Sequence, residues 1–240
     1  KIGPDPRNFN QRVSLGRNDL LIRTFLRTPY TNSYMNCCLI SPYQAAVHAA
    51  KTVGTDQGLT FHIEDAIKQH PSWLSYMPET TPKPIAEYQG DTYCCDLKAV
   101  SEAIRLIGRP VMPGQYLFHG GKWPTEYKHG AIFETTRPLS TTLCPNIAMG
   151  VPQWHGRAYR NNAIDLFVLR VSEPRAKGFF FNSKDIDTGH EKELVFEQGV
   201  KLTLTSCEDI QEIPVADFNL SSSVQKTKDV TVRVLAIEIS

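Results

Sequence analysis

The stretch Glu191-Lys192-Glu193-Leu194-Val195-Phe196 decides how the second half of this chain is interpreted. Two acidic residues alternate with a lysine and lead directly into an apolar run that is typical of a short buried strand. Because side chains alternate across a strand, the carboxylates of Glu191 and Glu193 are expected on the same face. Charged residues at the start of a buried strand are unusual unless they have a function, so this segment is a candidate functional site.

Two upstream segments are candidates to lie beside the Glu191–Phe196 strand in the fold. The first is Tyr116-Leu117-Phe118-His119-Gly120-Gly121, a short apolar strand that ends in histidine and two glycines, and the second is Leu139-Ser140-Thr141-Thr142-Leu143. In this order the three segments resemble the NAD site of the ADP-ribosyltransferase superfamily. There, a first strand ends in Arg-Gly or His-Gly, a second begins with a Ser-Thr-Ser type triplet, and a third carries Glu-x-Glu with a catalytic second glutamate.

The organisation of the chain changes near residue 113. Helices are predicted over residues 34–53, 63–70 and 97–107, with a loop over 77–92. Strands are predicted over residues 116–119, 164–171, 178–181, 193–196, 201–205 and 230–239, with a bulge or burial of both faces near Val234. The sequence therefore predicts an α+β chain.

The resemblance implies the ADP-ribosyltransferase fold, in which two packed, mostly antiparallel sheets hold NAD in the cleft between them. We expect one domain over residues 1–240, with a helical N-terminal part over 1–112 and a β-rich NAD-binding core over 113–240. A chain of 240 residues can bury a sizeable core without disulfides.

Composition excludes several other classes of protein. A net charge of +1 argues against a nucleic-acid binder, and no apolar stretch approaches the 18 residues or so of a membrane span. The chain begins with Lys1, which indicates a trimmed or processed form. The six cysteines show no C-x-x-C or Cys/His ligand spacing, so we expect free, mostly buried thiols and no metal.

The chemistry of NAD cleavage explains why these residue types should meet. Breaking the nicotinamide–ribose bond generates an oxocarbenium-like sugar, which a nearby carboxylate stabilises. Glu193 is the candidate for that carboxylate, the alternative being a strand-edge charge that faces solvent. Ser140 would fix the Glu193 rotamer by a hydrogen bond, and Glu191 would bind or deprotonate the incoming nucleophile.

The residues expected to bind NAD are His119, Gly120, Ser140, Thr141, Arg157 and Phe180. His119 would hydrogen-bond the ribose hydroxyls, and Gly120 would let the backbone approach the nicotinamide amide. Arg157 would pair with the diphosphate, and Phe180 or Tyr159 would stack on nicotinamide unless core packing claims them. Residues 182–190 correspond to the acceptor-recognition loop of the superfamily.

His119 departs from the arginine of most bacterial toxins and resembles the poly-ADP-ribose polymerase and diphtheria-toxin branch, which however has tyrosine where this chain has Ser140. The expectation is a mono-ADP-ribosyltransferase that consumes NAD as substrate, a monomeric effector or toxin secreted by a bacterium and acting in the host cytosol. The acceptor could be a threonine of ubiquitin or an arginine of another host protein. An NAD glycohydrolase and an inactive binding module with the same fold remain alternatives.

Overall fold

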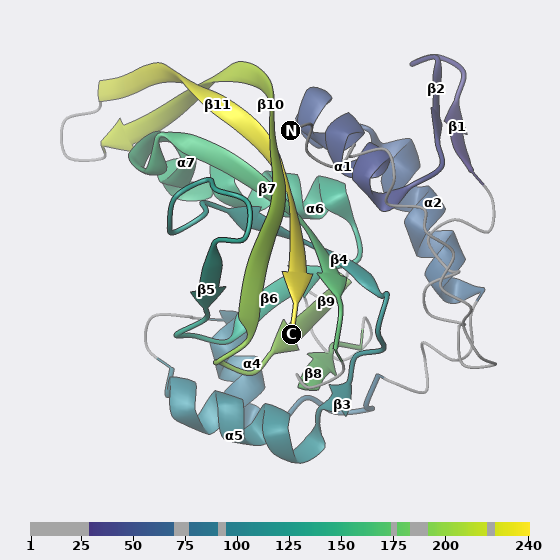
Figure 1. Cartoon of the computed structure of the whole chain (residues 1–240), viewed down its shortest axis with the longest axis vertical. Helices are drawn as coiled ribbons and strands as arrows, with labels where there is room; N and C mark the ends of the chain where they lie inside the picture. Colours follow the sequence, from purple (N-terminus) through teal and green to yellow (C-terminus); the bar gives the residue numbers. More distant parts are fainter. Residues whose placement is uncertain (1–28, 70–76, 91–94, 174–176, 183–191, 220–223) are drawn as a thin grey trace.

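The computed structural model describes residues 29–69, 77–90, 95–173, 177–182, 192–219 and 224–240 (Figure 1). The helices are α1 (Pro42–Lys51), α2 (Gln57–Lys68), α4 (Lys83–Gly90), α5 (Leu97–Ile107), α6 (Pro145–Gly150) and α7 (Arg157–Asn161), with the 3₁₀ helix η3 (Val151–Gly156). The strands are β1 (Tyr30–Asn32), β2 (Cys37–Leu39), β3 (Arg109–Pro110), β4 (Tyr116–Gly121), β5 (Ile132–Glu134), β6 (Leu139–Thr142), β7 (Ala163–Val171), β8 (Lys177–Phe180), β9 (Glu193–Phe196), β10 (Lys201–Asn219) and β11 (Val224–Ile239). The predicted α+β class is confirmed.

In the part of the chain that the structure describes, nine strands form one sheet in the order β3-β8-β9-β6-β4-β7-β11-β10-β5. All neighbouring pairs are antiparallel except β7 with β11, which run parallel. The junction between β4 and β6 is narrow, because only Phe118 and Thr142 are paired there. This junction divides the sheet into a first group, β3-β8-β9-β6, and a second group, β4-β7-β11-β10-β5.

The two groups share one hydrophobic core. It contains Phe180, Leu194 and Phe196 from the first group and Leu117, Leu169 and Ile237 from the second. Two packed, mostly antiparallel sheets were predicted. The packing agrees with that prediction, whereas the hydrogen bonds through Phe118 and Thr142 make the two groups one continuous, curled sheet.

Helices cover both outer faces of this arrangement. Helices α4 and α5 pack on the first group through a cluster that includes Ile85, Ile104 and Val195. Helices α1, α6 and α7 pack on the second group through a cluster rich in alanine and valine. In Figure 1, α4 and α5 lie at the lower end of the sheet, and α1 and α2 lie beside it with the small β1–β2 hairpin.

Local sequence explains where these helices begin. The Ser41 hydroxyl accepts from the Gln44 amide at the start of α1, and Pro42 occupies the first turn, where its missing N–H costs nothing. The buried side chains of α1 are alanines, so its backbone can approach the sheet closely. Asp96 caps α5 in the same way, by accepting from the amides of Lys98 and Ala99.

The prediction of a helix over residues 34–53 is wrong in its first part. Residues 30–39 form the β1–β2 hairpin instead, with Tyr30 opposite Leu39. The Asn32 side chain accepts from the amides of Tyr34 and Met35, and Asn36 adopts a left-handed conformation with φ of 48°. Asparagine favours both side-chain hydrogen bonds to nearby backbone amides and the left-handed conformation, and both are typical of turns. The two asparagines therefore favour a turn here, although the segment is apolar enough to suggest a helix.

The prediction of a loop over residues 77–92 is also wrong, because α4 occupies its centre. Pro82 lies just before the helix and Pro84 lies in its first turn, where a proline is tolerated. The helix then buries Ile85 and Tyr88 against the sheet. The helix predicted over 63–70 begins earlier, at Gln57, because Asp56 accepts from the Gly58 amide and caps it.

The last two strands are longer than predicted. The hairpin β10–β11 continues beyond the predicted ranges through pairs such as Ala216 with Thr227 and Asp217 with Lys226. These pairs carry no apolar alternation, so hydrophobic patterning could not find them. Both faces of β11 are buried around Val234 as predicted, and the register of β10 shifts between Leu204 and Ser206 and between Asp209 and Gln211.

The cysteines of the described ranges form no disulfide, and they are less buried than predicted. Cys144 is buried, Cys37 and Cys95 are half-buried, and Cys38 and Cys207 are exposed. Within the same ranges, no helix combines the length and apolar character that a membrane span requires.

Candidate active site

Ser140 and Glu193 meet across two neighbouring strands. In the antiparallel pair β6–β9, Ser140 lies opposite Val195 and Thr142 lies opposite Glu193. The side chains of Ser140 and Glu193 therefore lie on the same face, and the Ser140 hydroxyl donates a hydrogen bond to Glu193 Oε1. Glu193 is only 8% exposed. A carboxylate buried to this degree requires hydrogen-bond donors, and Ser140 supplies one of them.

Gln89 supplies a second donor to Glu193. Its Nε2 lies 2.8 Å from Glu193 Oε2, so both carboxylate oxygens are held. Gln89 belongs to α4, which lies in the proline-rich segment that was predicted to be a loop. The neighbouring Tyr88 anchors this helix by donating to the Pro138 carbonyl at 2.8 Å, just before β6. Burial raises the pKa of Tyr88 to about 12, which keeps this donor protonated.

His119 reaches the same site from β4. Its Nδ1 lies 2.7 Å from the Ser140 carbonyl oxygen. Because a carbonyl only accepts, Nδ1 carries the proton and Nε2 of the neutral ring is an acceptor. Burial lowers the pKa of His119 below its ordinary value, and the hydrogen bond to Ser140 opposes this shift only in part. The ring packs on Phe167 with centroids 5.2 Å apart.

Ser140 therefore joins the three segments that the sequence singled out. Its carbonyl accepts from His119, and its hydroxyl donates to Glu193. The two contacts come from opposite neighbours of β6, since β4 and β9 flank it in the sheet. The narrow junction between the two strand groups lies at this point, which brings a neutral imidazole and a buried carboxylate to one place.

The two glycines after His119 have different neighbours. A Cβ built on Gly120 would lie 1.8 Å from the Ala148 carbonyl oxygen, so α6 can pack on β4 only if this residue lacks a side chain. A Cβ on Gly121 would lie 3.0 Å from Nε2 of His119. Gly120 thus has a packing role in addition to the predicted approach to nicotinamide, and Gly121 leaves space beside the imidazole.

The remaining residues of the hydroxyl triplet brace the strands. Thr141 points to the face opposite Ser140, is 2% exposed, and donates to the Leu194 carbonyl at 2.7 Å. The Thr142 hydroxyl accepts from the Cys144 amide at 3.1 Å, where β6 leads into α6. The structure therefore does not bring Thr141 to the Glu193 side, and its hydroxyl holds β6 against β9.

Two predicted NAD contacts also lie apart from this cluster. Phe180 is 2% exposed and belongs to the central core, so core packing explains it and stacking on a ligand does not. Arg157 begins α7, and the next residue, Ala158, packs in the cluster on the outer face of the second strand group. His119 faces the other side of that group, toward Phe167. Tyr159, on the same helix as Arg157, faces the Lys228 ammonium at 4.5 Å.

The entry to β9 has an unusual backbone. Lys192 has φ of 54°, which few residues other than glycine, asparagine and aspartate adopt. Its carbonyl accepts from the Leu143 amide at 3.2 Å, and its ammonium lies 3.9 Å from Glu64 of α2. This conformation sets the direction in which the chain enters β9 at Glu193. Glu191 and residues 183–190, which include nearly all of the predicted acceptor loop, lie outside the described residues.

A buried aspartate that the sequence did not single out supports the His119 strand. Asp165 of β7 is fully buried and accepts from the Trp123 amide and the Tyr127 hydroxyl, both at 2.7 Å. Arg233 lies 3.5 Å from its other carboxylate oxygen. Trp123 packs edge-on against Phe167, which in turn supports the His119 ring. In the sequence, the sign of this network was a single aspartate, Asp165, within an otherwise apolar strand.

No protein-family model matches the chain, and no curated protein does. Among solved structures, the chain is similar to the enzymatic component C2-I of the C2-toxin from Clostridium botulinum, at 13% identity and a TM-score of 0.41 over 72% of this chain and 46% of that one. It is also similar to the ADP-ribosylating toxin BECa of C. perfringens, at 11% identity and a TM-score of 0.42 over 82% of this chain and 49% of that one. A third similar structure is the ADP-ribosyltransferase Vis from Vibrio splendidus, at 12% identity and a TM-score of 0.37 over 91% of this chain and 90% of that one.

The chain thus spans about half the length of the first two proteins and most of the third. BECa and Vis carry the activity of the superfamily that the three sequence segments resemble. Identities of 11–13% and TM-scores below 0.5 do not assign an activity to this chain.

Proposed function

We propose that this chain is a mono-ADP-ribosyltransferase, with NAD as substrate and a side chain of a protein as acceptor. The single observation that carries the proposal is the Glu193 carboxylate, which receives hydrogen bonds on both oxygens from Ser140 and Gln89 beside a neutral His119. A carboxylate fixed in this way is preorganised to stabilise positive charge and needs little rearrangement during the reaction.

The reaction fits this arrangement. The bond between ribose and nicotinamide breaks, and its electron pair goes to the pyridinium nitrogen, so nicotinamide leaves as a neutral molecule. Positive charge develops on the ribose, where the Glu193 carboxylate would stabilise it as in glycoside hydrolysis. The acceptor atom then bonds to the ribose carbon and loses its proton. Glu191 is proposed as the residue that receives this proton or binds the acceptor.

His119 would bind the sugar. Its Nδ1 donates to Ser140, which leaves the Nε2 lone pair to accept a hydrogen bond from a ribose hydroxyl. Gly121 supports this role because it has no side chain beside Nε2. A neutral imidazole also avoids placing a positive charge next to a sugar that becomes positive, and the lowered pKa of His119 favours that state.

For the acceptor, we propose a threonine of ubiquitin, because the set of His119, Ser140 and Glu193 behind a helical front resembles the effector family with that specificity. The chain would then be a monomeric, single-domain effector or toxin that a bacterium secretes and that acts in the host cytosol. An arginine of another host protein is the second candidate, since Glu191 and Glu193 match the Glu-x-Glu pattern that accompanies arginine acceptors.

The test is to incubate the purified chain with labelled NAD and either ubiquitin or a cell lysate, and to map the labelled residue by mass spectrometry. A protein adduct on a threonine of ubiquitin is the expected result. An adduct on an arginine of a lysate protein would support the transferase activity and would show that the acceptor is not ubiquitin. The matched control is Glu193→Gln, which should give no adduct.

Two outcomes would contradict the transferase. Free ADP-ribose produced at the same rate with and without every acceptor would indicate an NAD glycohydrolase. A failure to bind NAD in calorimetry would indicate an inactive binding module with this fold.

A further inference from the structure

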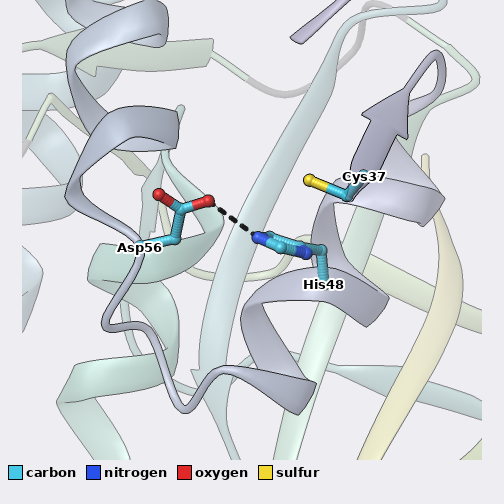
Figure 2. A group of neighbouring side chains, drawn as sticks. All are labelled: Cys37, His48 and Asp56. Atoms are coloured by element: carbon cyan, nitrogen blue, oxygen red, sulfur yellow. Dashed lines mark hydrogen bonds and ion pairs between the residues drawn. The ribbon is translucent and has the colours of Figure 1, made fainter. Parts of the chain in front are cut away.

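A second cluster of reactive side chains lies near the β1–β2 hairpin, apart from the residues assigned to NAD chemistry. Cys37 of β2, His48 of α1 and Asp56, which caps α2, each offer one ligand atom, and these atoms all lie within 4.8 Å of one another. Figure 2 shows the Cys37 sulfur pointing toward the space between the His48 ring and the Asp56 carboxylate. His48 Nε2 lies 2.8 Å from Asp56 Oδ2.

We propose that Cys37, His48 and Asp56 form a binding site for one divalent transition-metal ion, with Zn²⁺ as the best match. Thiolate sulfur, imidazole nitrogen and carboxylate oxygen are the three ligand types that Zn²⁺ takes in proteins. Three protein ligands leave a fourth tetrahedral position for water. The metal replaces the thiol proton, which passes to solvent. It also binds His48 Nε2, whose proton, now hydrogen-bonded to Asp56, moves through solvent to Nδ1, so the imidazole stays neutral.

The charges of the cluster favour this ion. A thiolate, a carboxylate and a neutral imidazole carry two negative charges together, which a divalent cation balances. The His48 and Asp56 side chains are 10% and 4% exposed, so water screens these charges poorly. A doubly charged ion with soft and borderline ligands is therefore a better match than Mg²⁺ or Ca²⁺, which prefer oxygen ligands.

The surroundings of Asp56 have the arrangement that a ligating carboxylate needs. Its Oδ1 accepts from the Gly58 amide at 3.0 Å, and the Tyr30 hydroxyl lies 3.0 and 2.9 Å from its two oxygens. Asn32 Nδ2 lies 3.4 Å from Oδ1. These donors orient the carboxylate without His48, so Oδ2 can bind a metal while Oδ1 keeps its partners. Such outer hydrogen bonds are typical of metal sites.

The geometry requires only a small adjustment. Zn–N and Zn–O bonds of about 2.0 Å and a Zn–S bond of about 2.3 Å place tetrahedral ligand atoms about 3.3–3.6 Å apart. The His48–Asp56 pair at 2.8 Å has to open slightly, and the Cys37 sulfur, now within 4.8 Å of the other two ligand atoms, has to move inward. The metal would then join the β1–β2 hairpin to α1 and to the start of α2.

The test uses the full chain and Co²⁺ as a coloured substitute for Zn²⁺. One equivalent of Co²⁺ should produce a thiolate-to-metal charge-transfer band, and Zn²⁺ should abolish that band by displacement. Cys37→Ser should lose the band and bind Zn²⁺ at least about 100-fold more weakly, since loss of an outer partner alone costs 10- to 100-fold. Cys38→Ser is the matched control and should keep the band, because Cys38 is the exposed neighbour on the same strand.

A second measurement needs no variant and holds even if Cys37→Ser fails to fold. Zn²⁺ should slow alkylation of Cys37 in the native chain at least about tenfold, while Cys38, read from the same peptide by mass spectrometry, stays unchanged. Equal alkylation rates of Cys37 with and without Zn²⁺ would overturn the site. The same conclusion would follow if the Co²⁺ band were missing from the wild-type chain or kept in Cys37→Ser. None of these readouts depends on NAD cleavage.

Discussion

The hydroxyl of Ser140 on β6 donates to the carboxylate of Glu193 on β9, and the two residues stand on paired strands rather than on loops. Strand pairing fixes both backbones, and the hydrogen bonds from Ser140 and Gln89 hold the Glu193 side chain in its rotamer. Sites built on regular elements hold their geometry more tightly than sites built on loops. This relationship makes Glu193 the first residue to test.

Glu193→Gln should lower the rate of NAD cleavage about 10²- to 10³-fold, because it removes the charge that stabilises the sugar cation. The fold should survive, since the amide is isosteric with the carboxylate and Ser140 can rotate its hydroxyl. Steady-state NAD turnover and thermal unfolding measure both effects. Glu197→Gln, at the residue that follows β9, is the control and should keep full turnover.

Wild-type turnover in Glu193→Gln would remove Glu193 from the reaction. A variant that melts far below the parent would instead assign Glu193 a structural role, and its kinetics would then carry no information on catalysis.

Gln89→Ala should reduce kcat about 10- to 100-fold, because a hydrogen bond to a charged group contributes about 1.5–3 kcal/mol. The affinity for NAD should change much less if Gln89 acts only through Glu193. Stopped-flow turnover and calorimetric NAD binding separate the two quantities. Glu87→Gln is the control on the same helix, since the Glu87 side chain is 54% exposed. Equal kcat values in Gln89→Ala and the parent would mean that Gln89 does not position Glu193 for the reaction.

Gln89→Glu tests the same contact through pH. A second carboxylate beside Glu193 disfavours its charged form and raises its pKa. Glu193 would then lose its charge at a higher pH than in the parent, so the acidic limb of the pH–rate profile should move upward. An unchanged limb would show that ionisation of Glu193 does not control the rate.

The residues that the sequence brought forward share a local signal. His119 and Glu193 each stand at a polar position next to a short apolar run, and the strands β4 and β9 follow from those runs. Ser140 lies in the polar strand β6, and it was singled out by the resemblance to the superfamily motifs. Pairing of these three strands in one sheet then brings the three residues together. Hydrophobic period predicted β4 and β9, whereas the meeting of the three segments was implied by the resemblance.

The parts of the fold and of the site that the sequence did not predict depend on contacts between segments that are distant in the chain. Helix α4 forms because Ile85 and Tyr88 pack on the sheet, whereas its prolines locally indicate a loop. Gln89 therefore could not be found from sequence. The packing role of Gly120 depends in the same way on Ala148, which approaches from α6. Cys37, His48 and Asp56 come from three segments and match no metal-ligand spacing.

His119→Ala should weaken NAD binding by about 0.5–1.5 kcal/mol, the value of one hydrogen bond. Turnover should fall further, because the sugar is then less well placed relative to Glu193. Calorimetry measures the first effect and single-turnover kinetics the second. His129→Ala, which changes an exposed histidine, is the control. Unchanged NAD affinity in His119→Ala would remove His119 from the binding site.

The lowered pKa of His119 also predicts how stability depends on pH. The unfolded chain binds the proton more tightly than the folded chain, so the stability that neutral His119 contributes is fully present above about pH 6.5. It is lost as pH falls from there through the folded pKa. His119→Gln should therefore lose less stability than the parent between pH 7 and pH 5 in urea unfolding. Parallel losses in the two proteins would contradict the lowered pKa.

Gly120→Ala should destabilise the fold, because the new Cβ would lie 1.8 Å from the Ala148 carbonyl oxygen and 2.8 Å from Pro152 Cδ. Backbone atoms of α6 have to move to make room, and overpacking of this kind costs about 1–3 kcal/mol or more. The melting temperature should fall by at least about 2–4 °C, which is the shift for each kcal/mol in a chain of this size.

Gly150→Ala is the matched control, since a Cβ built on Gly150, at the end of α6, meets no atom of the described structure within 4 Å. It should melt near the parent temperature. If Gly120→Ala were equally stable, α6 would not pack against β4 as closely as these contacts require, and the junction beside His119 would have to be open enough to accept a side chain.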